Sequence, residues 1–456
     1  MTHSNVPPTA GGESRRKFLK KATAASAVAA TAGLFKTPVY GQNQAPSANV
    51  AGANNRLVVG FIGVGGQGMA HVRAQKEHAQ QNNIALAAVN DVWTKRIEGA
   101  KNTIGGNCQG YDDYRKLLER NDIDAVTIST VDHWHTKCAV DAMNSGKHVY
   151  VEKPMTRYLM EAFEIYDAVK KTGKILTVGS QGSSDRKYHV AAELIKSGKT
   201  GQLVHFQGSY MRNNPNGEWN YGIDPDATAA TLDWQQWLGP IHKKVPFNAD
   251  HYFRWRKYYP YCAGLLGDLI PHRLHPLMLA TGNPEFPSRV ASVGNKKVGT
   301  DRNTPNTYER DVDEIVQLIA EFPSGLTAWV TSATINEQGV TDMIRGHKAS
   351  ITLSGNRVEL RPERSFTDEI DPERIDNISP GESVPVHEAN WFQSIRENKQ
   401  PNAGIDLAVK VQTLISLAEI SDRLNVMCLF DEKTRKITTA DGKEVQPLTY
   451  GTLELS

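Results

Sequence analysis

The sequence has little of what builds disulfide frameworks, zinc ribbons or nucleic-acid surfaces. Its 456 residues include only four cysteines, none of them in a C-x-x-C pair: Cys108, Cys138, Cys262 and Cys428. Four buried or incidental thiols are therefore the simpler interpretation, although an oxidising compartment would permit a disulfide. The net charge is only +2, and no long basic run follows the amino-terminal segment, so nothing favours a nucleic-acid partner.

The amino terminus has no apolar stretch long enough to span a membrane, but it carries an export signature. The stretch Ser14-Arg15-Arg16-Lys17-Phe18-Leu19-Lys20 has the twin-arginine pattern, and alanine-rich residues 22–35 follow it. A span needs about 20 apolar residues, so this is no integral membrane anchor. We expect residues 1–48 to be a signal peptide and flexible leader, read by the twin-arginine export machinery, and the protein to be periplasmic or otherwise exported. An amphipathic surface helix is the alternative.

Export by this pathway affects what is expected of a cofactor. The pathway carries folded proteins, so a nucleotide could be loaded before export, and we expect it to be tightly bound.

About 400 residues remain after the leader, which suggests two domains because single cores stop growing at about 250 to 300 residues.

A glycine-rich stretch follows a short apolar run near the start of the remaining chain. Residues 57–62 are typical of a buried parallel strand. The next residues have the spacing G-x-G-x-x-G and comprise Gly63, Gly65, Gly66, Gln67 and Gly68. In a dinucleotide site the first glycine allows a tight turn, the second lets amides approach a pyrophosphate, and the third lets helix and strand pack closely. A helix starting here would direct its positive end at the phosphates.

Asp91 follows the second predicted strand, at 84–89, where a ribose-binding acid belongs. A carboxylate there accepts hydrogen bonds from ribose hydroxyls and repels a 2′-phosphate, so it favours NAD. Lys95 and Arg96 lie close enough in sequence to leave NADP open. A helix N-cap is the alternative role for Asp91.

Strands and helices continue to alternate as far as residue 178. We expect strands at 123–129, from 148 and at 175–178, with helices at 136–144 and about 159–171. This alternation predicts an α/β Rossmann domain, a doubly wound parallel sheet, over residues 55–181. Ligands of such sheets bind beyond the carboxyl ends of the strands, where two polar stretches follow: Thr130 to His135, and Glu152-Lys153-Pro154.

Lys153 stands at the end of the strand expected from residue 148. A lysine there can polarise a carbinol or carbonyl oxygen while hydride moves to or from a bound nicotinamide. With the glycine stretch, Asp91, Asp132-His133-Trp134-His135 and Glu152-Lys153-Pro154, the sequence resembles the Gfo/Idh/MocA oxidoreductases, the glucose–fructose oxidoreductase and inositol dehydrogenase group. The Asp-His-Trp-His form and the export signature are similar to the secreted branch of that family. The cofactor site, for NAD or NADP, should include the glycine stretch with Asp91, Thr130, His133, Trp134, His135, Glu152, Lys153 and Gln181.

The pattern changes after residue 181. Strand-like runs at 203–210, 315–322, 326–332 and 349–353 lack regular helical partners, which predicts a largely antiparallel sheet. The resemblance likewise implies an α+β domain, at 182–456, whose large, mostly antiparallel open sheet covers the nicotinamide and often serves in oligomer contacts. We therefore expect a homo-oligomer. Helices at 387–398 and 406–424 should pack back on the core.

The segment from residue 264 to 276 should line the substrate pocket opposite Lys153. Asp268 and His272 are spaced i,i+4, which places them on one helical face, and His275 follows where the family more usually has aspartate. His272 or His275 could be the general base. The two histidines, with Asp268 or His133, could instead hold a divalent metal, or they could be structural. We predict no metal.

Together these observations predict an exported NAD(P)-dependent oxidoreductase of the CH–OH dehydrogenase class. Its substrate would be a sugar, a glycoside or a cyclic polyol, and its catalytic residues would be Lys153, Asp268, His272 and His275. Aromatic and arginine side chains crowded into residues 212–258 suit sugar faces and hydroxyls, unless they only stabilise their own loop.

Two other functions remain open. Bound NAD could oxidise a sugar hydroxyl transiently so that a glycosidic bond is eliminated and rehydrated, which would make the protein a glycosidase. Alternatively, the fold could bind a sugar or nucleotide without catalysis, since a fold alone does not carry a function.

Overall fold

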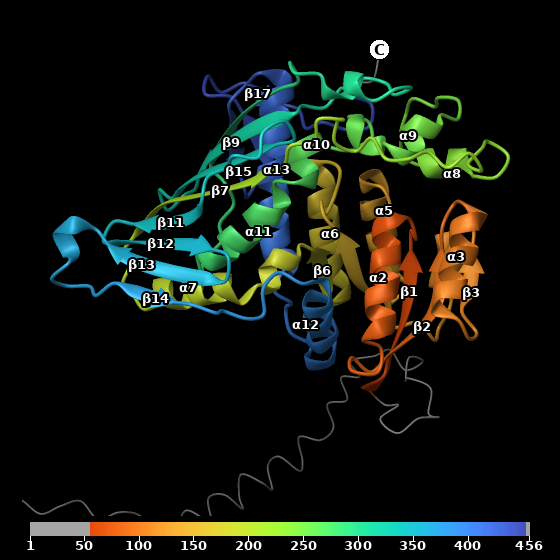
Figure 1. Ribbon diagram of the computed structural model, residues 1–456, viewed down its shortest axis with the longest axis horizontal. Coiled ribbons are helices and arrows are strands. Elements are labelled where there is room, and N and C mark those ends of the chain that lie inside the picture. Colours follow the sequence, from red (N-terminus) through yellow and green to blue (C-terminus); the bar gives the residue numbers. More distant parts are fainter. Residues whose placement is uncertain (1–54, 453–456) are drawn as a thin grey trace, which may run out of the picture. The chain divides into compact units, whose positions relative to one another are not determined.

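The computed structural model describes residues 55–452, in which two separate sheets organise the chain (Figure 1). The predicted signal peptide and leader at 1–48 lie outside this range. Residues 55–452 fall within one compact unit, so the division predicted near residue 181 stays a prediction. No helix in this range combines the length and apolarity needed to cross a bilayer.

The predicted parallel sheet is confirmed. Six strands lie in the order β3-β2-β1-β4-β5-β6, and every neighbouring pair is parallel. The strands are β1 (Leu57–Ile62), β2 (Ile84–Asn90), β3 (Gln109–Tyr111), β4 (Ala125–Ile128), β5 (His148–Glu152) and β6 (Leu176–Gly179). β4 and β5 are buried along their whole length because helices cover both faces of the sheet. The strand order reverses between β1 and β4, which creates the crevice where ligands of such sheets bind.

The helices of this half are α2 (Gly66–Glu77), α3 (Thr94–Ile104), α4 (Tyr114–Leu118), α5 (Asp132–Asn144) and α6 (Leu159–Thr172). The predicted start of α5 at residue 136 is wrong, because the helix begins at Asp132. His133 and His135 are buried polar residues in its first turn, so apolar periodicity did not reveal that turn.

The second sheet has eleven strands, in the order β14-β13-β12-β11-β7-β10-β9-β8-β15-β16-β17. Within the described residues, every neighbouring pair except β7 with β10 is antiparallel, which confirms the predicted fold class. The strands are β7 (Leu203–Met211), β8 (Arg289–Asn295), β9 (Ile315–Glu321), β10 (Thr327–Ala333), β11 (Asp342–Gly346), β12 (Ala349–Ser354), β13 (Arg357–Pro362), β14 (Glu373–Ile375), β15 (Cys428–Asp431), β16 (Lys436–Thr438) and β17 (Glu444–Val445).

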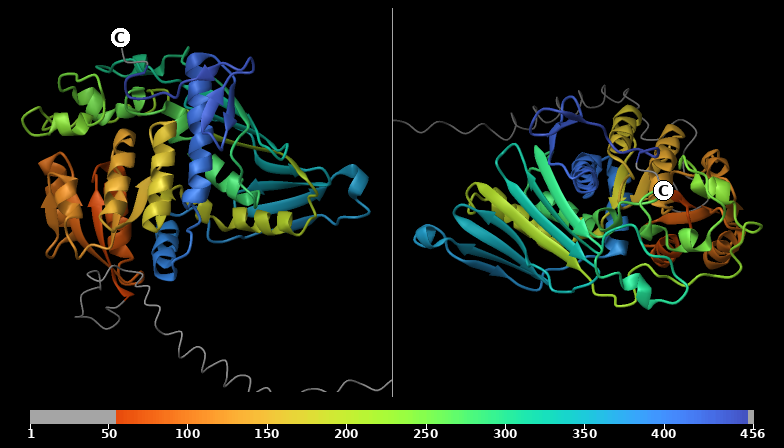
Figure 2. Two further views of the ribbon diagram at one scale, coloured as in Figure 1. Left: turned by 180° about the vertical axis from the view of Figure 1, so that it is seen from behind. Right: turned by 90° about the horizontal axis from the view of Figure 1, so that it is seen from above.

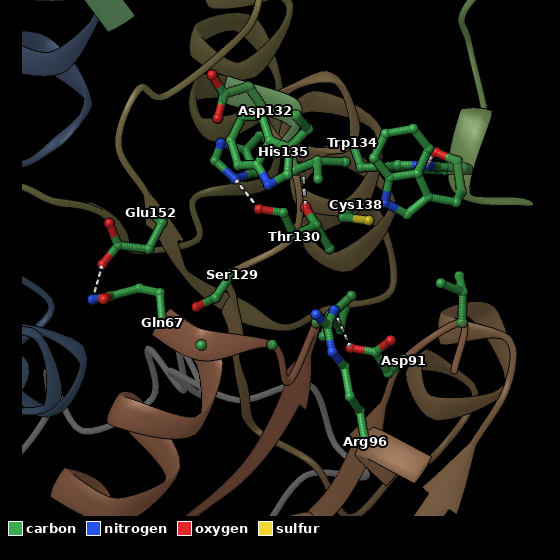
Figure 3. Close-up of a pocket in the computed structure, with 18 of the residues that line it drawn as sticks. Gln67, Asp91, Arg96, Ser129, Thr130, Asp132, Trp134, His135, Cys138 and Glu152 are labelled. Atoms are coloured by element: carbon green, nitrogen blue, oxygen red, sulfur yellow. Dashed lines mark hydrogen bonds and ion pairs between the residues drawn. The ribbon is translucent and has the colours of Figure 1, made fainter. Parts of the chain in front are cut away.

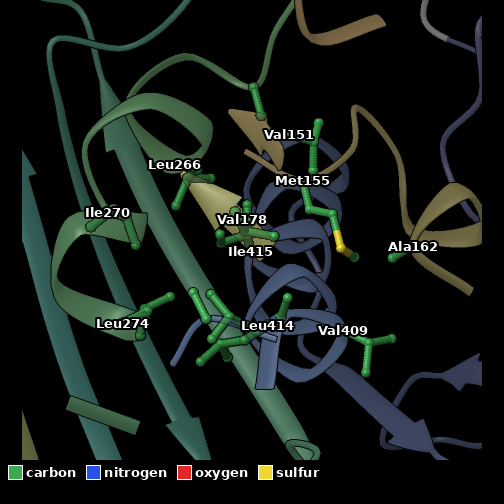
Figure 4. Packing of buried hydrophobic residues seen from close by; sticks show 14 of the residues in the cluster. Val151, Met155, Ala162, Val178, Leu266, Ile270, Leu274, Val409, Leu414 and Ile415 are labelled. Atoms are coloured by element: carbon green, nitrogen blue, oxygen red, sulfur yellow. The ribbon is translucent and has the colours of Figure 1, made fainter. Parts of the chain in front are cut away.

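Helices of the second half cover one face of this sheet (Figure 2). They include α7 (Arg186–Lys196), α10 (Gly264–Asp268), α11 (Pro271–Ala280) and α13 (Ile405–Leu424). α13 also contacts α6 and β6, and α12 (Val384–Glu397) contacts α2. Both late helices therefore pack back on the core, as predicted, and they do so against the nucleotide-binding half. Figure 4 shows the resulting apolar core, in which Leu414 and Ile415 of α13 meet Val178 of β6 and Leu266 of α10.

The expectation that Asp268 and His272 share one helical face is wrong. α10 ends at Asp268, and α11 begins at Pro271. Proline fixes φ and has no N–H, so it suits the first turn of a new helix rather than the middle of a continuous one. The two side chains therefore lie on different helices.

Candidate active site

A cavity of about 520 Å³ lies where the loops after β1, β2, β4 and β5 meet the second half of the chain (Figure 3). Ten predicted site residues line it: Gly63, Gly65, Gly66, Gln67, Asp91, Thr130, Trp134, His135, Glu152 and Lys153. The second half contributes Tyr221, Gln236, Trp237, Tyr252, Phe253, Trp255 and Arg256. The cavity therefore joins a nucleotide-type loop to a wall of aromatic side chains.

The glycine-rich loop has the shape that a pyrophosphate requires. Gly63 has φ +81°, and a Cβ there would lie 2.8 Å from the Ser129 carbonyl oxygen. A Cβ on Gly68 would lie 2.1 Å from the Gly63 carbonyl oxygen, so only glycine lets α2 pack this close. No side chain caps the amino end of α2, and its first turn holds no acidic residue. Its free amides and positive end are thus available to an anion.

Asp91 lies beside this loop and is held by backbone amides. Its Oδ2 accepts from Val64 N at 3.0 Å and its Oδ1 from Trp93 N at 3.1 Å. Burial raises the pKa of Asp91, and the Arg96 guanidinium, 4.0 Å away, opposes that rise. A carboxyl fixed in this way can still accept from ribose hydroxyls through its remaining lone pairs. Arg96 itself lies over the Tyr252 ring, 4.8 Å from its centre.

Lys153 is held by Asp268. Its Nζ donates to the Asp268 carbonyl oxygen and to Oδ1, each at 2.7 Å. Arg256 Nε donates to the same Oδ1 at 3.1 Å, and Trp219 Nε1 donates to Oδ2 at 3.1 Å. Burial alone would raise the pKa of Asp268, but the charges of Lys153 and Arg256 outweigh it and hold the pKa well below its usual range. Asp268 is therefore an anion that fixes two cations at the cavity.

Asp132 is a further carboxyl at the cavity, in the first turn of α5. It is buried beside α10, since a Cβ on Gly267 would lie 3.8 Å from its Oδ2. Burial raises the pKa of Asp132 to about 8, with Arg256 opposing the rise and Asp268 adding to it. A carboxyl that titrates near neutral pH is suited to exchange protons with a substrate.

Residues 57–180 match the model of the Gfo/Idh/MocA family, described as an oxidoreductase family with an NAD-binding Rossmann fold. Residues 57–180 are a Gfo/Idh/MocA NAD-binding domain.

Curated relatives and solved structures extend the comparison. A glycosyl hydrolase family 109 protein of Shewanella baltica is 31% identical over 213 residues, and an alpha-N-acetylgalactosaminidase of Shewanella oneidensis is 30% identical over 212. Each match spans 43% of this chain and 46% of the relative, so the chain matches about half the length of these relatives.

Two solved structures have a similar fold. An oxidoreductase domain protein from Kribbella flavida has a TM-score of 0.65 at 21% identity, covering 83% of this chain and all of the other. Levoglucosan dehydrogenase in complex with NADH and levoglucosan has a TM-score of 0.62 at 20% identity, covering 82% and 98%. These similarities extend the likeness of fold across both halves of the described chain.

Several predicted residues support the Gfo/Idh/MocA site from outside the cavity lining. Gly68 lets α2 pack closely against the Gly63 carbonyl oxygen. His133 Nε2 donates to the Trp237 carbonyl oxygen at 2.9 Å. Gln181 Nε2 donates to Tyr150 Oη at 3.1 Å and to Glu152 at 3.4 Å. His135, which does line the cavity, donates from Nδ1 to the Pro154 carbonyl oxygen at 2.7 Å and so ties α5 to the Glu-Lys-Pro turn.

The structure does not bring His272 and His275 to the cavity. His272 stacks on Tyr210, 4.7 Å between ring centres, and its Nδ1 lies 3.5 Å from Glu382 Oε1. His275 is 2% exposed within α11, and burial lowers its pKa to about 3. Their role as general bases therefore stays a prediction without geometric support. Within residues 55–452, no group of three His, Cys, Asp or Glu side chains could hold a metal ion.

The positions of Asp132 and Arg256 at the cavity, beside Lys153 and Asp268, were not predicted from the sequence. Asp132 was visible as the first residue of the Asp-His-Trp-His stretch, but only its position in a buried helical turn makes it titrate near neutral pH. Arg256 belonged to a group of arginines expected to bond hydroxyls, and nothing in its spacing linked it to Asp268. Both assignments depend on contacts between distant segments.

Proposed function

We propose that the protein is an NAD-dependent oxidoreductase that removes hydride from a hydroxyl-bearing carbon of a sugar, a glycoside or a cyclic polyol. One observation carries the proposal: Lys153, oriented by Asp268, lies in the same cavity as the glycine-rich loop and Asp91. The NAD-binding Rossmann family of residues 57–180 and the fold shared with levoglucosan dehydrogenase support it.

The chain's own residues suit this chemistry. Bound NAD supplies the acceptor for the hydride. Lys153 would donate a hydrogen bond to the substrate oxygen and stabilise negative charge on it, while Arg256 adds a second positive charge nearby. The aromatic wall formed by Tyr221, Trp255 and their neighbours would pack on sugar C–H surfaces and exclude water.

Asp132 is the residue that we propose to accept the hydroxyl proton. It lines the cavity and has a pKa of about 8, whereas His272 and His275 lie away from the cavity. The Lys153–Asp268 pair would then keep its charge throughout. The proton would pass to Asp132 where this carboxyl is ionised, a fraction that grows as the pH rises through 8.

The curated relatives favour a second candidate, a glycosidase that oxidises the sugar only transiently. One relative carries the name alpha-N-acetylgalactosaminidase, and the cavity suits both reactions because both begin with removal of hydride. Incubating the protein with a glycoside, without added cofactor, separates them. A keto-sugar supports the oxidoreductase, released aglycone without net oxidation supports the glycosidase, and no product from any glycoside supports a binding protein.

A tightly held cofactor is part of the proposal. A strap, which we define as residues 219–256, reaches over the nucleotide side of the cavity. Its Trp237 carbonyl oxygen accepts from His133 Nε2 and from Trp134 Nε1, each at 2.9 Å. Asp233 N donates to the Val92 carbonyl oxygen at 3.0 Å. These hydrogen bonds would have to break for the cofactor to leave. Mass spectrometry of the purified protein should therefore detect bound NAD, with NADP as the alternative.

Export and self-association complete the proposal. The twin-arginine stretch would direct the folded protein to the periplasm, and Arg15→Lys with Arg16→Lys should leave it in the cytoplasm, as cell fractionation would show.

The open face of the large sheet exposes Val293 (72%) and Ile319 (52%), which would suit a contact between copies. Light scattering of Ile319→Glu should show smaller particles than wild type.

A further inference from the structure

A buried three-residue network lies behind the wall of the cavity. His71, on α2, has no exposed surface, and its Nε2 lies 2.8 Å from Glu152 Oε1. Its Nδ1 lies 2.7 Å from Oε1 of Glu388, a 1% exposed residue of α12. Glu152 lines the cavity, but His71 and Glu388 do not. The imidazole therefore connects Glu152, whose carboxylate lines the cavity, to Glu388, whose carboxylate is buried away from it.

The network has a defined charge. A ring that donates to an ionised carboxylate from each of its nitrogens is an imidazolium. Burial would lower the pKa of His71, but its hydrogen bonds to Glu152 and Glu388 outweigh that effect and raise the pKa. Burial would likewise raise the pKa of Glu152, yet His71 and Lys153 lower it. Two carboxylates and one imidazolium leave a net charge of −1.

The opposite charge lies on the substrate side. Lys153, Asp268 and Arg256 together carry +1, beside the place where a substrate oxygen would become negative. Hydride transfer requires the reacting carbons to approach within about 3.5 Å, so the nicotinamide must lie next to Lys153 and thus next to Glu152. The oxidised nicotinamide ring carries a positive charge and the reduced ring none. The −1 network therefore favours the oxidised ring.

We propose that Glu388, acting through His71 on Glu152, is a positioning residue that fixes the negative charge behind the nicotinamide subsite and so sets the relative affinity for NAD+ and NADH. The inference rests on the proposed function, since it needs a nicotinamide in this cavity. Nothing in the match of residues 57–180 includes Glu388, which comes from a helix more than 200 residues beyond it in the chain.

Glu388→Gln is the sharpest variant, because it removes the charge and keeps the contacts. Oε1 of Glu388 accepts from His71 and also from Gln75 Nε2 at 2.9 Å, and the amide oxygen of glutamine can accept both bonds. One unit charge roughly 10 Å from the ring, at an effective dielectric of about 20, changes a binding constant about tenfold. Kd for NAD+ divided by Kd for NADH should therefore rise about tenfold, equal to a rise of about 30 mV in the potential of the bound two-electron couple.

The experiment titrates cofactor-stripped protein with NADH and NAD+, by fluorescence and by competition, and checks the potential by dye equilibration. Glu388→Asp keeps the charge and should hold the ratio within about twofold of wild type, which also provides a test if Glu388→Gln does not fold. Glu397→Gln removes an exposed charge from the same helix and should leave the ratio unchanged.

The possible outcomes separate this inference from the function on which it rests. A ratio that rises with Glu388→Gln alone supports it. Equal weakening of both cofactors by Glu388→Gln and Glu388→Asp would mean a purely structural role and overturns it, as would an unchanged ratio. A wild-type protein that binds neither dinucleotide overturns the proposed function as well.

Discussion

Replacing Lys153 with alanine tests the centre of the proposed site. Lys153 donates to Asp268 through Nζ, and its removal does not leave the aspartate alone. Arg256 and Trp219 still donate to Asp268, each at 3.1 Å. Losing one of three donors to a carboxylate should cost about 1–2 kcal/mol of unfolding free energy, well below the 3–5 kcal/mol of a buried charge left unpaired. The variant should therefore fold and still bind NAD within about threefold of wild type.

The loss of activity should be far larger than the loss of stability. A donor that stabilises a developing oxyanion contributes about 10²–10³-fold to kcat, so Lys153→Ala should lower kcat about 10³-fold in single-turnover measurements of nicotinamide absorbance. Lys170→Ala, which breaks an exposed pair with Asp406, is the matched control and should behave as wild type. A Lys153→Ala enzyme that retains cofactor and a kcat within tenfold of wild type would refute the assigned role.

Three further predictions concern a proton, the glycine loop and cofactor choice. Because the raised pKa of about 8 keeps Asp132 protonated at pH 7, kcat/KM for oxidation should increase as pH rises through 8, and Asp132→Asn should abolish this limb of the pH profile. Gly68→Ala should lower the Tm of cofactor-free protein because its Cβ meets the Gly63 carbonyl, whereas Gly66→Ala, with nothing within 4 Å, should not. Asp91→Ala should raise the Kd for NAD about 10–100-fold, because the ribose hydroxyls lose their acceptor. The Kd for NAD should then lie closer to the Kd for NADP than in wild type, as calorimetry would measure.

The fold of the first half could be predicted closely because local signals determine it. Continuous apolar runs mark strands buried on both faces, and the glycine spacing fixes the first turn between strand and helix. β1 and α6 begin at the predicted residues. The start of α5 could not be predicted in this way. The buried side chains of its first turn include two histidines that donate hydrogen bonds to backbone carbonyls distant in sequence, so the turn has no apolar pattern.

The second half was predictable in class but not in detail. Strands such as β9 alternate between buried and exposed residues, which indicates a sheet covered on one face. The parallel pairing of β7 with β10 was not visible, because strands from distant parts of the chain pair through tertiary contacts that no local pattern records. For the same reason the site could be predicted where it follows parallel strand ends and, as a region, in the aromatic and arginine side chains of residues 212–258. The contact of Arg256 with Asp268 could not be predicted.

His275 is a predicted catalytic residue that lies in a buried and nearly apolar environment. The family resemblance implied an aspartate there, and the sequence favoured a catalytic role for the histidine in its place. In the structure His275 is 2% exposed, its Nδ1 bonds to the Pro271 carbonyl oxygen at 3.3 Å, and within the described residues its Nε2 has no hydrogen-bond partner. A carboxylate in such surroundings would be a buried charge without a cation, which costs several kcal/mol, whereas a neutral imidazole is tolerated. The proposed function therefore assigns the proton transfer to Asp132, which lines the cavity and whose pKa burial raises to about 8.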